Sequence, residues 1–491
     1  MNILLKHRTL AVVLLSFFAL ISCKQSENTI VVREAPTSSD KSDTTAVQQE
    51  THGSFKQLTI GEVTAIRSLD PLFIENTSGM RTIQLLYEGL VRYDENAEVI
   101  PAVAKDWTVS SDKHTYRFTL NNDIFYHDNN VFSNGLGRKL LASDVKFAFE
   151  RMAKGTVPDR AAQLFMNIRG FEPYFQEQHQ VMMETDRQLN SVNGIQVIND
   201  STLTISLVEP DPNFLNKLAT PRAVIYPKEA VINSGFKAVG SGPYKLSQKR
   251  SDSLYILARF ENYRLPNQPK INRIDIRTGT DQTALMNAMN LGDIQLIPEL
   301  GPRQIQMVTT NDGQLKAGLA QNYRLFDSKG AAIYALHYNS GSDVPQSSVA
   351  SALRNVKADQ FFPDLPQGFF QLNRLPAETT PAASVDSLGS TFSNDPFVRG
   401  FYSTLSEQLG QQGITFQMKS TRVPNRNTAL YIRQDLPLYP QYQLNLSDNV
   451  LSWFSVQSLA LAANEVEDIG FNEFPWWINL RSTNLSTENT R

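Results

Sequence analysis

Cysteine is almost absent from the sequence: Cys23 is the only one among 491 residues. A disulfide framework and a cysteine-cluster metal site are therefore both excluded. Basic residues are not in excess either, because 46 Lys and Arg face 49 Asp and Glu and leave a net charge of −3. Nucleic-acid-binding proteins normally carry a basic excess or a basic stripe, so the composition argues against a nucleic-acid partner.

Motifs of the common hydrolases, metalloproteases and nucleotide-binding enzymes are missing. The chain contains no GxSxG, HExxH or GxxxxGK[ST]. The six histidines show no metal-ligand spacing, so His127-Asp128 predicts a surface turn rather than a metal site. Gly240-Ser241-Gly242 has no following Lys-Ser/Thr and helix, and predicts a structural turn rather than a phosphate site. These observations favour a protein that is not an enzyme and that holds neither a metal nor a cofactor.

Apolar runs of membrane-spanning length are also lacking. The run from Leu10 to Ile21 has twelve residues, whereas a spanning helix needs roughly 20. It follows a short basic segment and ends in Leu-Ile-Ser-Cys, so residues 1–22 predict a secretory signal. The ending resembles a bacterial lipobox, in which the cysteine is lipidated and becomes the mature N-terminus. The alternative is an ordinary signal peptide with a chance cysteine. We expect Cys23 to anchor the protein in the cell envelope, on the periplasmic or extracellular side of a membrane.

The segment after the signal has little that could form a core. Residues 24–54 contain ten Ser or Thr and no aromatic residue, so we expect residues 23–54 to be a flexible tether. The whole chain is 41% hydrophobic and 19% charged, which suits globular lobes. Its length leaves room for two or three of them.

Strand-like and helix-like patterns alternate along the rest of the chain. Tyr116, Phe118 and Leu120 alternate with polar residues, which predicts a half-buried strand. Ser143 is positioned to cap a helix that carries Val145 and Phe149 on one face. The predicted strands are 55–63, 115–120, 203–207, 271–276, 333–338 and 414–418, and the predicted helices are 78–90, 143–152 and 397–409. The pattern indicates a mixed α/β protein without a fixed repeat.

Ten short segments follow one another in a characteristic order. They are SLDP (68–71), LLYEGLVRYD (85–94), PAVAKDW (101–107), SDKHTYRFTL (111–120), LLASDVKFAFERM (140–152), DSTLTISLVEPDPNFL (200–215), AVIYPKEAV (223–231), GSGPYKL (240–246), ENY (261–263) and GDIQLIPEL (292–300). In this order and spacing they resemble one known family, the extracellular solute-binding proteins of the oligopeptide, dipeptide and nickel class, which are the receptors of ABC importers. The resemblance covers residues 55–339.

The resemblance implies a two-lobed periplasmic-binding-protein type II (Venus-flytrap) fold with an extra small domain inserted in the first lobe. It implies capture of a peptide or similar small solute by hinge closure, delivery to ABC transporter permease subunits, and a monomer. The expected parts are lobe I (55–84, 196–277 and 436–491), the extra domain (85–195) and a shortened lobe II (278–435).

Several polar residues are candidate ligand contacts by this resemblance. Glu75, Asn76 and Thr77 follow the first strand, where family members present groups to the cleft; the alternative is a solvated loop. Asn339 ends a strand near the expected hinge, where it either lines the cleft or caps the strand.

Tryptophans form a second group of candidates. Trp453, Trp476 and Trp477 either form an aromatic pocket or pack in the core or between the lobes.

The resemblance fades after residue 339, and one family feature is missing there. Peptide-binding members carry an aspartate that pairs with the α-amino group of the ligand, and the sequence offers no counterpart in that segment. Asp395-Pro396 precedes a predicted helix, which is the wrong place in the sequence for that aspartate. We expect little preference for a free α-amino group. The shortened second lobe also suggests an alternative function: a receptor-derived lipoprotein that acts as a sensor or interaction module without transport.

Overall fold

The structure is a computed structural model. It describes residues 55–232, 235–265, 268–373, 384–435, 438–439 and 449–486. The signal at 1–22, Cys23 and the tether at 23–54 lie outside the described residues. Within the described ranges, every helix is too short or too polar to cross a membrane.

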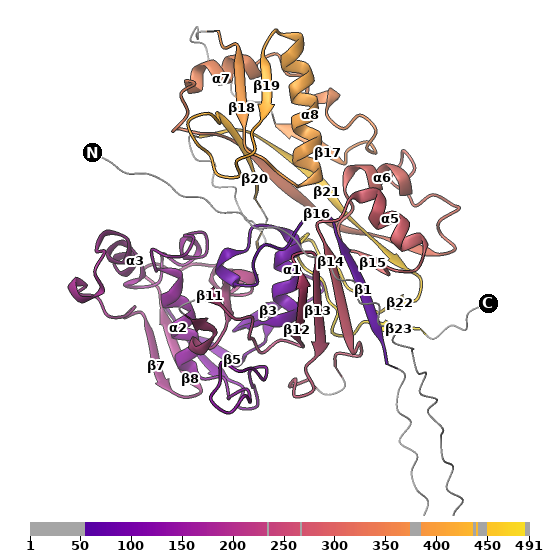
Figure 1. Cartoon of the computed structure of the whole chain (residues 1–491). Helices are drawn as coiled ribbons and strands as arrows, with labels where there is room; N and C mark the ends of the chain where they lie inside the picture. Colours follow the sequence, from indigo (N-terminus) through magenta and orange to yellow (C-terminus); the bar gives the residue numbers. More distant parts are fainter. Residues whose placement is uncertain are drawn as a thin grey trace, which may run out of the picture. The chain divides into compact units, whose positions relative to one another are not determined.

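One large mixed sheet forms the frame of the molecule (Figure 1). Its hydrogen-bonded order is β12-β13-β14-β1-β15-β21-β16-β20-β18-β19, and β17 pairs with β21. The strands are β1 (Gln57–Glu62), β12 (Tyr244–Ser251), β13 (Leu254–Arg259), β14 (Arg273–Thr278), β15 (Leu296–Ile297), β16 (Tyr323–Tyr338), β17 (Phe370–Asn373), β18 (Ser387–Ser390), β19 (Thr415–Met418), β20 (Leu430–Asp435) and β21 (Val450–Ala463).

Two long antiparallel strands, β16 and β21, run through the middle of this sheet (Figure 1). Their register extends from Tyr323 opposite Ala463 to His337 opposite Val450. The predicted strand at 333–338 is therefore only the last part of β16. The pairing joins the two halves of the sheet, and its register shifts between Asp327 and Ala331 and again between Leu336 and His337.

The buried apolar residues form two separate cores, which define two lobes. The cores meet at β15 and the end of β21: Leu296 and Ala462 belong to the first core, and Ile297 and Leu461 to the second. We call the part built on the first core lobe I and the part built on the second core lobe II. Most buried apolar residues of β21 belong to the second core, whereas those that follow β21 in the chain belong to the first.

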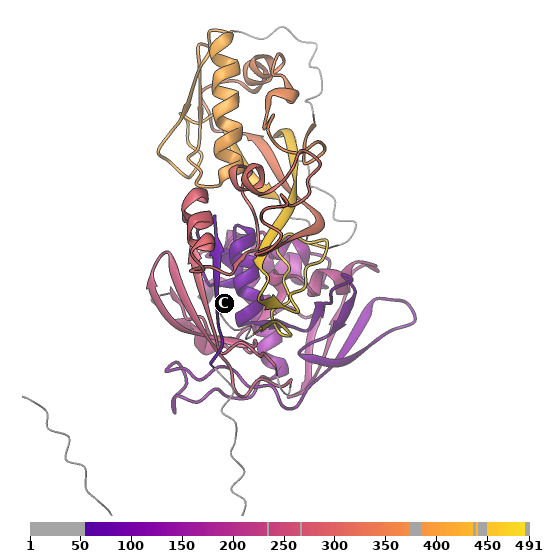
Figure 2. The same ribbon diagram turned by 90° about the vertical axis from the view of Figure 1, so that its right-hand side faces the viewer.

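Eight helices among the described residues cover these sheets: α1 (Thr77–Leu86), α2 (Ala142–Met152), α3 (Phe171–Gln180), α4 (Phe214–Leu218), α5 (Gln282–Asn290), α6 (Pro302–Val308), α7 (Gln346–Leu353) and α8 (Pro396–Gln411). In lobe II, α8 lies beside β18 and β19 (Figure 2). Tyr402 of α8 packs on Phe416 of β19 with ring centroids 5.6 Å apart, while Leu405 and Leu409 are fully buried.

A smaller four-stranded sheet lies in the region of the expected extra domain. Its order is β5 (Ala104–Val109), β6 (Thr115–Leu120), β8 (Thr202–Ser206) and β7 (Ile195–Asn199). Strand β6 has the bounds that the alternating pattern predicted. Strand β8 pairs with β6, so this sheet continues beyond residue 195, where the expected extra domain ended. Its apolar residues belong to the same core as those of lobe I.

The remaining described strands are short pairs: β2 (Glu88–Gly89) with β9 (Val224–Ile225), β3 (Val91–Tyr93) with β4 (Val99–Pro101), β10 (Val231–Ile232) with β11 (Gly235–Phe236), and β22 (Val466–Glu467) with β23 (Asn484–Leu485).

The start of α2 differs from the prediction. Ser143 lies inside the helix instead of capping it, and the cap is supplied by Asp144, whose carboxylate accepts the backbone N–H of Leu141 at 2.9 Å. Asp144 is held in place by Arg138, whose guanidinium donates to both carboxylate oxygens at 2.7 Å. A carboxylate at N3 that binds back to the N-cap N–H satisfies one donor at the helix start.

Candidate functional site

A cavity of about 300 Å³ has walls from both lobes. Such a position fits a ligand site, because small-molecule sites are concave and occur preferentially between domains. A further hollow of about 440 Å³ is lined by lobe II alone. The residues that line the two-lobe cavity are Thr64, Ala65, Arg67, Glu75, Asn76, Arg160, Tyr334, Thr391, Phe392, Ser393, Asn394, Asp395, Val398, Arg422, Val423, Pro424, Tyr431, Ile432, Arg433 and Gln434.

Two of the four candidate ligand contacts, Glu75 and Asn76, line this cavity. Arg67 forms an ion pair with Glu75 and donates a hydrogen bond to its carboxylate at 2.8 Å. Both side chains are more than two fifths exposed. Asn76 caps α1: its Oδ1 accepts the backbone N–H of Gly79 at 2.9 Å, and its Nδ2 donates to the carbonyl of Ala65 at 2.9 Å. Asn76 therefore fixes the N-terminal end of α1 against the loop that forms one wall.

The other two candidates do not line it. Thr77 is fully buried, and its hydroxyl donates to the carboxylate of Glu299. Asn339 follows the end of β16, and its Nδ2 donates to the carbonyls of Asn425 and Thr428, both at 2.8 Å. These bonds hold the loop that precedes β20, as expected of a residue that caps a strand end.

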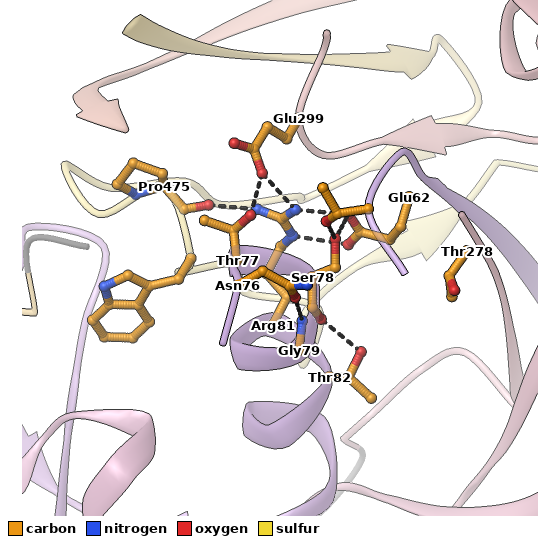
Figure 3. Close-up of polar contacts among 12 residues, drawn as sticks. Glu62, Asn76, Thr77, Ser78, Gly79, Arg81, Thr82, Thr278, Glu299 and Pro475 are labelled. Carbon is orange, nitrogen blue, oxygen red and sulfur yellow. Dashed lines mark hydrogen bonds and ion pairs between the residues drawn. The ribbon is translucent and has the colours of Figure 1, made fainter. Parts of the chain in front are cut away.

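Thr77 belongs to a buried ionic network around Arg81 of α1 (Figure 3). The guanidinium donates to both oxygens of Glu62, at 2.8 and 2.6 Å, and to Glu299 at 3.0 Å. A further bond of 2.6 Å goes to the carbonyl of Pro475. Burial lowers the pKa of Arg81, but the Glu62 and Glu299 carboxylates outweigh it, so the pKa is raised and the guanidinium stays charged.

This network reaches the wall of the cavity through two hydroxyls. Ser78 donates to Glu62 at 2.8 Å, and the hydroxyls of Ser78 and Thr64 are 2.6 Å apart. Thr64 lines the cavity. The first turn of α1 thus connects the cleft wall to a buried salt bridge.

Asp395, which the sequence analysis did not count among the candidate ligand contacts, lines the cavity from lobe II. It is the N-cap of α8: its Oδ1 accepts the N–H groups of Phe397 and Val398 at 2.9 and 3.0 Å. Its Oδ2 accepts the hydroxyl of Tyr334 at 3.3 Å, which in turn accepts Nε2 of Gln434 at 3.3 Å.

The carboxyl of Asp395 is partly neutral near pH 7. Burial, followed by the nearby charge of Glu299, raises its pKa from 3.8 to about 7, although the hydrogen bonds from α8 and Tyr334 oppose this. A carboxyl in this state can accept or donate a hydrogen bond to a ligand.

The three candidate tryptophans lie outside the cavity. Trp476 is fully buried, and its ring stacks on Phe474 with centroids 5.2 Å apart, while Trp477 is 3% exposed. Trp453, on β21, is partly buried. None of the three lines the two-lobe cavity. They therefore form no aromatic pocket at this site.

His127 is buried, contrary to the predicted surface turn. Its Nε2 donates to the carbonyl of Gly242 at 2.9 Å, and its Nδ1 accepts the N–H of Gly240 at 3.3 Å. A Cβ at Gly240 would lie 2.0 Å from the carbonyl oxygen of Leu86, so only glycine fits this approach. The Gly-Ser-Gly segment is the structural turn that the sequence predicted. Groups of three or more metal-ligating side chains do not occur among the described residues.

The comparisons with known proteins agree with this architecture. The family model for "Bacterial extracellular solute-binding proteins, family 5 Middle" matches residues 98–357, more than half of the chain. The dipeptide-binding protein of Escherichia coli K12 is 27% identical over 244 residues, which are 48% of this chain and 43% of that protein. The nickel-binding periplasmic protein of the same strain is 28% identical over 219 residues, or 43% and 36% of the two chains. The chain matches less than half the length of these relatives.

Solved structures extend the similarity to almost the whole described chain. Haemophilus influenzae OppA, in complex with the peptide RPPGFSPFR, has a TM-score of 0.70 at 14% identity and covers 88% of this chain and 99% of its own. AgaA from A. tumefaciens R10, in complex with agropinic acid, has a TM-score of 0.66 at 14% identity with the same coverage. These structures show the two-lobed fold of periplasmic binding proteins. Because the family model matches residues 98–357, this chain belongs to family 5 of the bacterial extracellular solute-binding proteins.

Proposed function

We propose that the protein is the solute receptor of an ABC import system, anchored to a membrane by lipid on Cys23. It captures a peptide or a similar small solute in the two-lobe cavity and delivers it to a membrane permease. The observation that carries this proposal is the cavity itself, because hydrogen-bonding groups from both lobes converge on about 300 Å³. Relatives named as dipeptide-, glutathione- and nickel-binding proteins support this class of function, as does a structure described as an ABC transporter-associated binding protein.

Hinge closure is the proposed mode of capture. Lobes that share only a few long strands can rotate about them, and a ligand that contacts both walls favours the closed state. Here β16 and β21 connect the lobes, while Glu75 and Asn76 lie on one wall and Asp395 on the other. Closure would bring these polar groups onto the ligand and exclude water from it.

A thermal-shift screen tests the proposal. We expect one class among di- to pentapeptides, nickel chelates, sugars and sugar acids to raise the melting temperature. A ligand at 100 times its dissociation constant adds about 2.7 kcal/mol to the free energy of unfolding. The absence of a shift with every class would favour the alternative in which the protein is a sensor or interaction module without transport.

A further inference from the structure

The two-lobe cavity is rich in arginine although the chain as a whole is slightly acidic. Four arginines line it, and lysine and histidine do not occur among the described lining residues. The only acidic residues there are Glu75 and Asp395, so the formal charge of the lining is four minus two, or +2. The pKa of Asp395, raised by burial to about 7, makes the true charge at neutral pH more positive still. The net charge of the chain, in contrast, is −3.

Two of these arginines, Arg422 and Arg433, belong to lobe II. Their partners differ from that of Arg67, which is paired with Glu75. Arg422 and Arg433 have no carboxylate within 4.0 Å among the side chains that the structure describes. Each guanidinium lies over an aromatic ring instead: Arg422 is 5.8 Å from the centroid of Phe392, and Arg433 is 5.1 Å from that of Tyr431. All four side chains line the cavity.

An aromatic ring that stacks on a guanidinium contacts only the face of the guanidinium. The N–H groups, which lie in the plane of the guanidinium, stay available for hydrogen bonds. These groups are the part of arginine that binds a carboxylate through two parallel hydrogen bonds. Stacking also limits the rotamers of a long side chain, so less conformational entropy is lost when the carboxylate binds. The arrangement therefore suits recognition of a planar anion.

Arg433 is positioned by the sheet. It lies on β20, opposite Ala335 of β16, and Tyr431 is two residues earlier on the same face of the strand. Tyr431 is itself stacked on His337 across the strand pair, with ring centroids 4.9 Å apart and an angle of 3° between the planes. Burial and the charge of Arg433 lower the pKa of His337 to about 4, so the histidine is neutral at pH 7 and Arg433 keeps the positive charge of this row.

Arg422 is positioned by a hydrogen-bonded loop. The hydroxyl of Thr421 donates to the carbonyl of Val423 at 2.7 Å, and the carbonyl of Thr421 accepts the N–H of Phe392 at 2.7 Å. Asn339 holds the following turn through the carbonyl of Asn425. The segments that carry Arg422 and its aromatic partner are thus bonded to each other.

We propose that the solute bound in this cavity is an acid, and that Arg422 and Arg433 bind its carboxylate. This inference rests on the proposed receptor function and specifies its ligand class. The neutral hydrogen-bonding groups beside the arginines, Ser393 and Asn394 among them, suit the amides or hydroxyls of the same molecule. Acidic peptides and sugar acids share this chemistry.

Matched acid and amide pairs test the inference by calorimetry on the mature protein. One pair is the C-terminally amidated peptides Ala-Glu-Ala-NH2 and Ala-Gln-Ala-NH2, in which the Glu side chain is the only carboxylate. The other pair is gluconate and gluconamide, so the two arms separate peptides from sugar acids. We expect the acid of at least one pair to bind at least tenfold more tightly than its amide. The preference should shrink when salt is raised from 0.1 to 0.5 M, because the exposed charges are then screened.

Substitutions identify the residues responsible. Arg422→Gln and Arg433→Gln should each weaken binding of the acid by roughly 10- to 100-fold, the range for a charged hydrogen bond, and binding of the amide by less than threefold. Arg422→Lys and Arg433→Lys should recover part of the loss, because they keep the charge but not the fork. Arg117→Gln, an exposed position on β6, removes the same charge away from the cavity and should change neither affinity.

Three results would overturn the inference. If the amides bind as well as the acids, the cavity is a receptor site for a different ligand class. If the glutamine variants weaken acid and amide equally, the two arginines only maintain the shape of the wall. If no member of either pair binds, the inference fails for both sources, and the receptor function itself is then in question only if the wider thermal-shift screen is also negative.

Discussion

Arg81 donates two hydrogen bonds to Glu62, of 2.8 and 2.6 Å, and both side chains are only 3% exposed. The pair joins α1 to β1 in the interior of lobe I (Figure 3). Glu299 and the carbonyl of Pro475 complete the contacts of the guanidinium. One side chain therefore connects α1 to β1 and to two segments that are 218 and 394 residues away in the sequence.

Removal of this guanidinium should destabilise the protein strongly. Arg81→Met leaves the Glu62 carboxylate buried without its partner, and breaking a buried ion pair in this way lowers the free energy of unfolding by about 3–5 kcal/mol. Arg67→Met is the matched control, because it breaks an exposed pair with Glu75 that is worth at most about 1 kcal/mol. Urea denaturation measures both; similar losses for the two variants would contradict the assigned role of Arg81.

Stability should fall in mild acid because of His127. Burial lowers its pKa from 6.5 to about 4, so below pH 6.5 the unfolded chain binds a proton that the folded chain does not. The free energy of unfolding should therefore decrease between pH 6.5 and 4, by about 3 kcal/mol in total from this group. His337, whose pKa is lowered in the same way, adds to the effect.

Substitution separates His127 from the rest of this pH dependence. His127→Gln should reduce the slope of unfolding free energy against pH between pH 6.5 and 4. An unaltered slope in the His127 variant would mean that the buried imidazole does not titrate as its surroundings indicate.

Asp395 should produce the opposite dependence in an overlapping range. Because its folded-state pKa of about 7 lies above its ordinary value of 3.8, the unfolded chain loses its proton first, and stability falls as pH rises from 4 to 7. Asp395→Asn keeps a good N-cap and removes the titration. The free energy of unfolding of the variant, minus that of the wild type, should be about 2–4 kcal/mol larger at pH 8 than at pH 4. Thermal unfolding at both pH values checks this; a constant difference would refute it.

A free α-amino group on a peptide ligand should matter little. Both oxygens of Asp395 already accept hydrogen bonds, and its pKa near 7 leaves the carboxylate only partly ionised. An N-acetylated peptide should therefore bind within about threefold of the free one, a difference under roughly 0.7 kcal/mol. Calorimetry on such a pair decides the point. A loss of more than about 30-fold on acetylation would mean that a carboxylate of the cavity binds the amine, and Glu75→Gln and Asp395→Asn would then show which one.

Membrane attachment should depend on Cys23. Acyl chains on this residue would contribute about 0.8 kcal/mol per buried methylene, and few other features of residues 1–54 favour a membrane after the signal is removed. Cys23→Ala should release the protein into the soluble fraction, while Ser26→Ala should not. Sedimentation of the processed Cys23 variant with membranes would point to another anchor.

The sequence predicted local structure well where the signal was local. The alternation from Thr115 to Leu120 depends on neighbouring residues alone, and β6 has those bounds. The buried histidine was missed because its partners, Gly240 and Gly242, lie more than a hundred residues away. The Asp-Pro pair at Asp395 is a helix-start signal, which says where α8 begins but not that this end of the helix faces the cleft.

The cleft could be predicted from the sequence even less than these residues, because segments far apart in the chain form it. The arginines that line it come from separate segments, and no spacing in the sequence relates Arg67 to Arg433. The burial of Arg81 also gave no local signal, because its neighbours at helical spacing include Thr77, Ser78 and Gln84, which are polar.

Mass spectrometry of the mature protein, first under native and then under denaturing conditions, tests the central claim most directly. The account predicts one small solute bound to each protein molecule, released on denaturation, negatively charged at neutral pH, and lost when Arg422 and Arg433 are both replaced by Gln. A protein that carries no solute, and that takes up none from a mixture of acidic peptides and sugar acids, would contradict a solute-binding cleft.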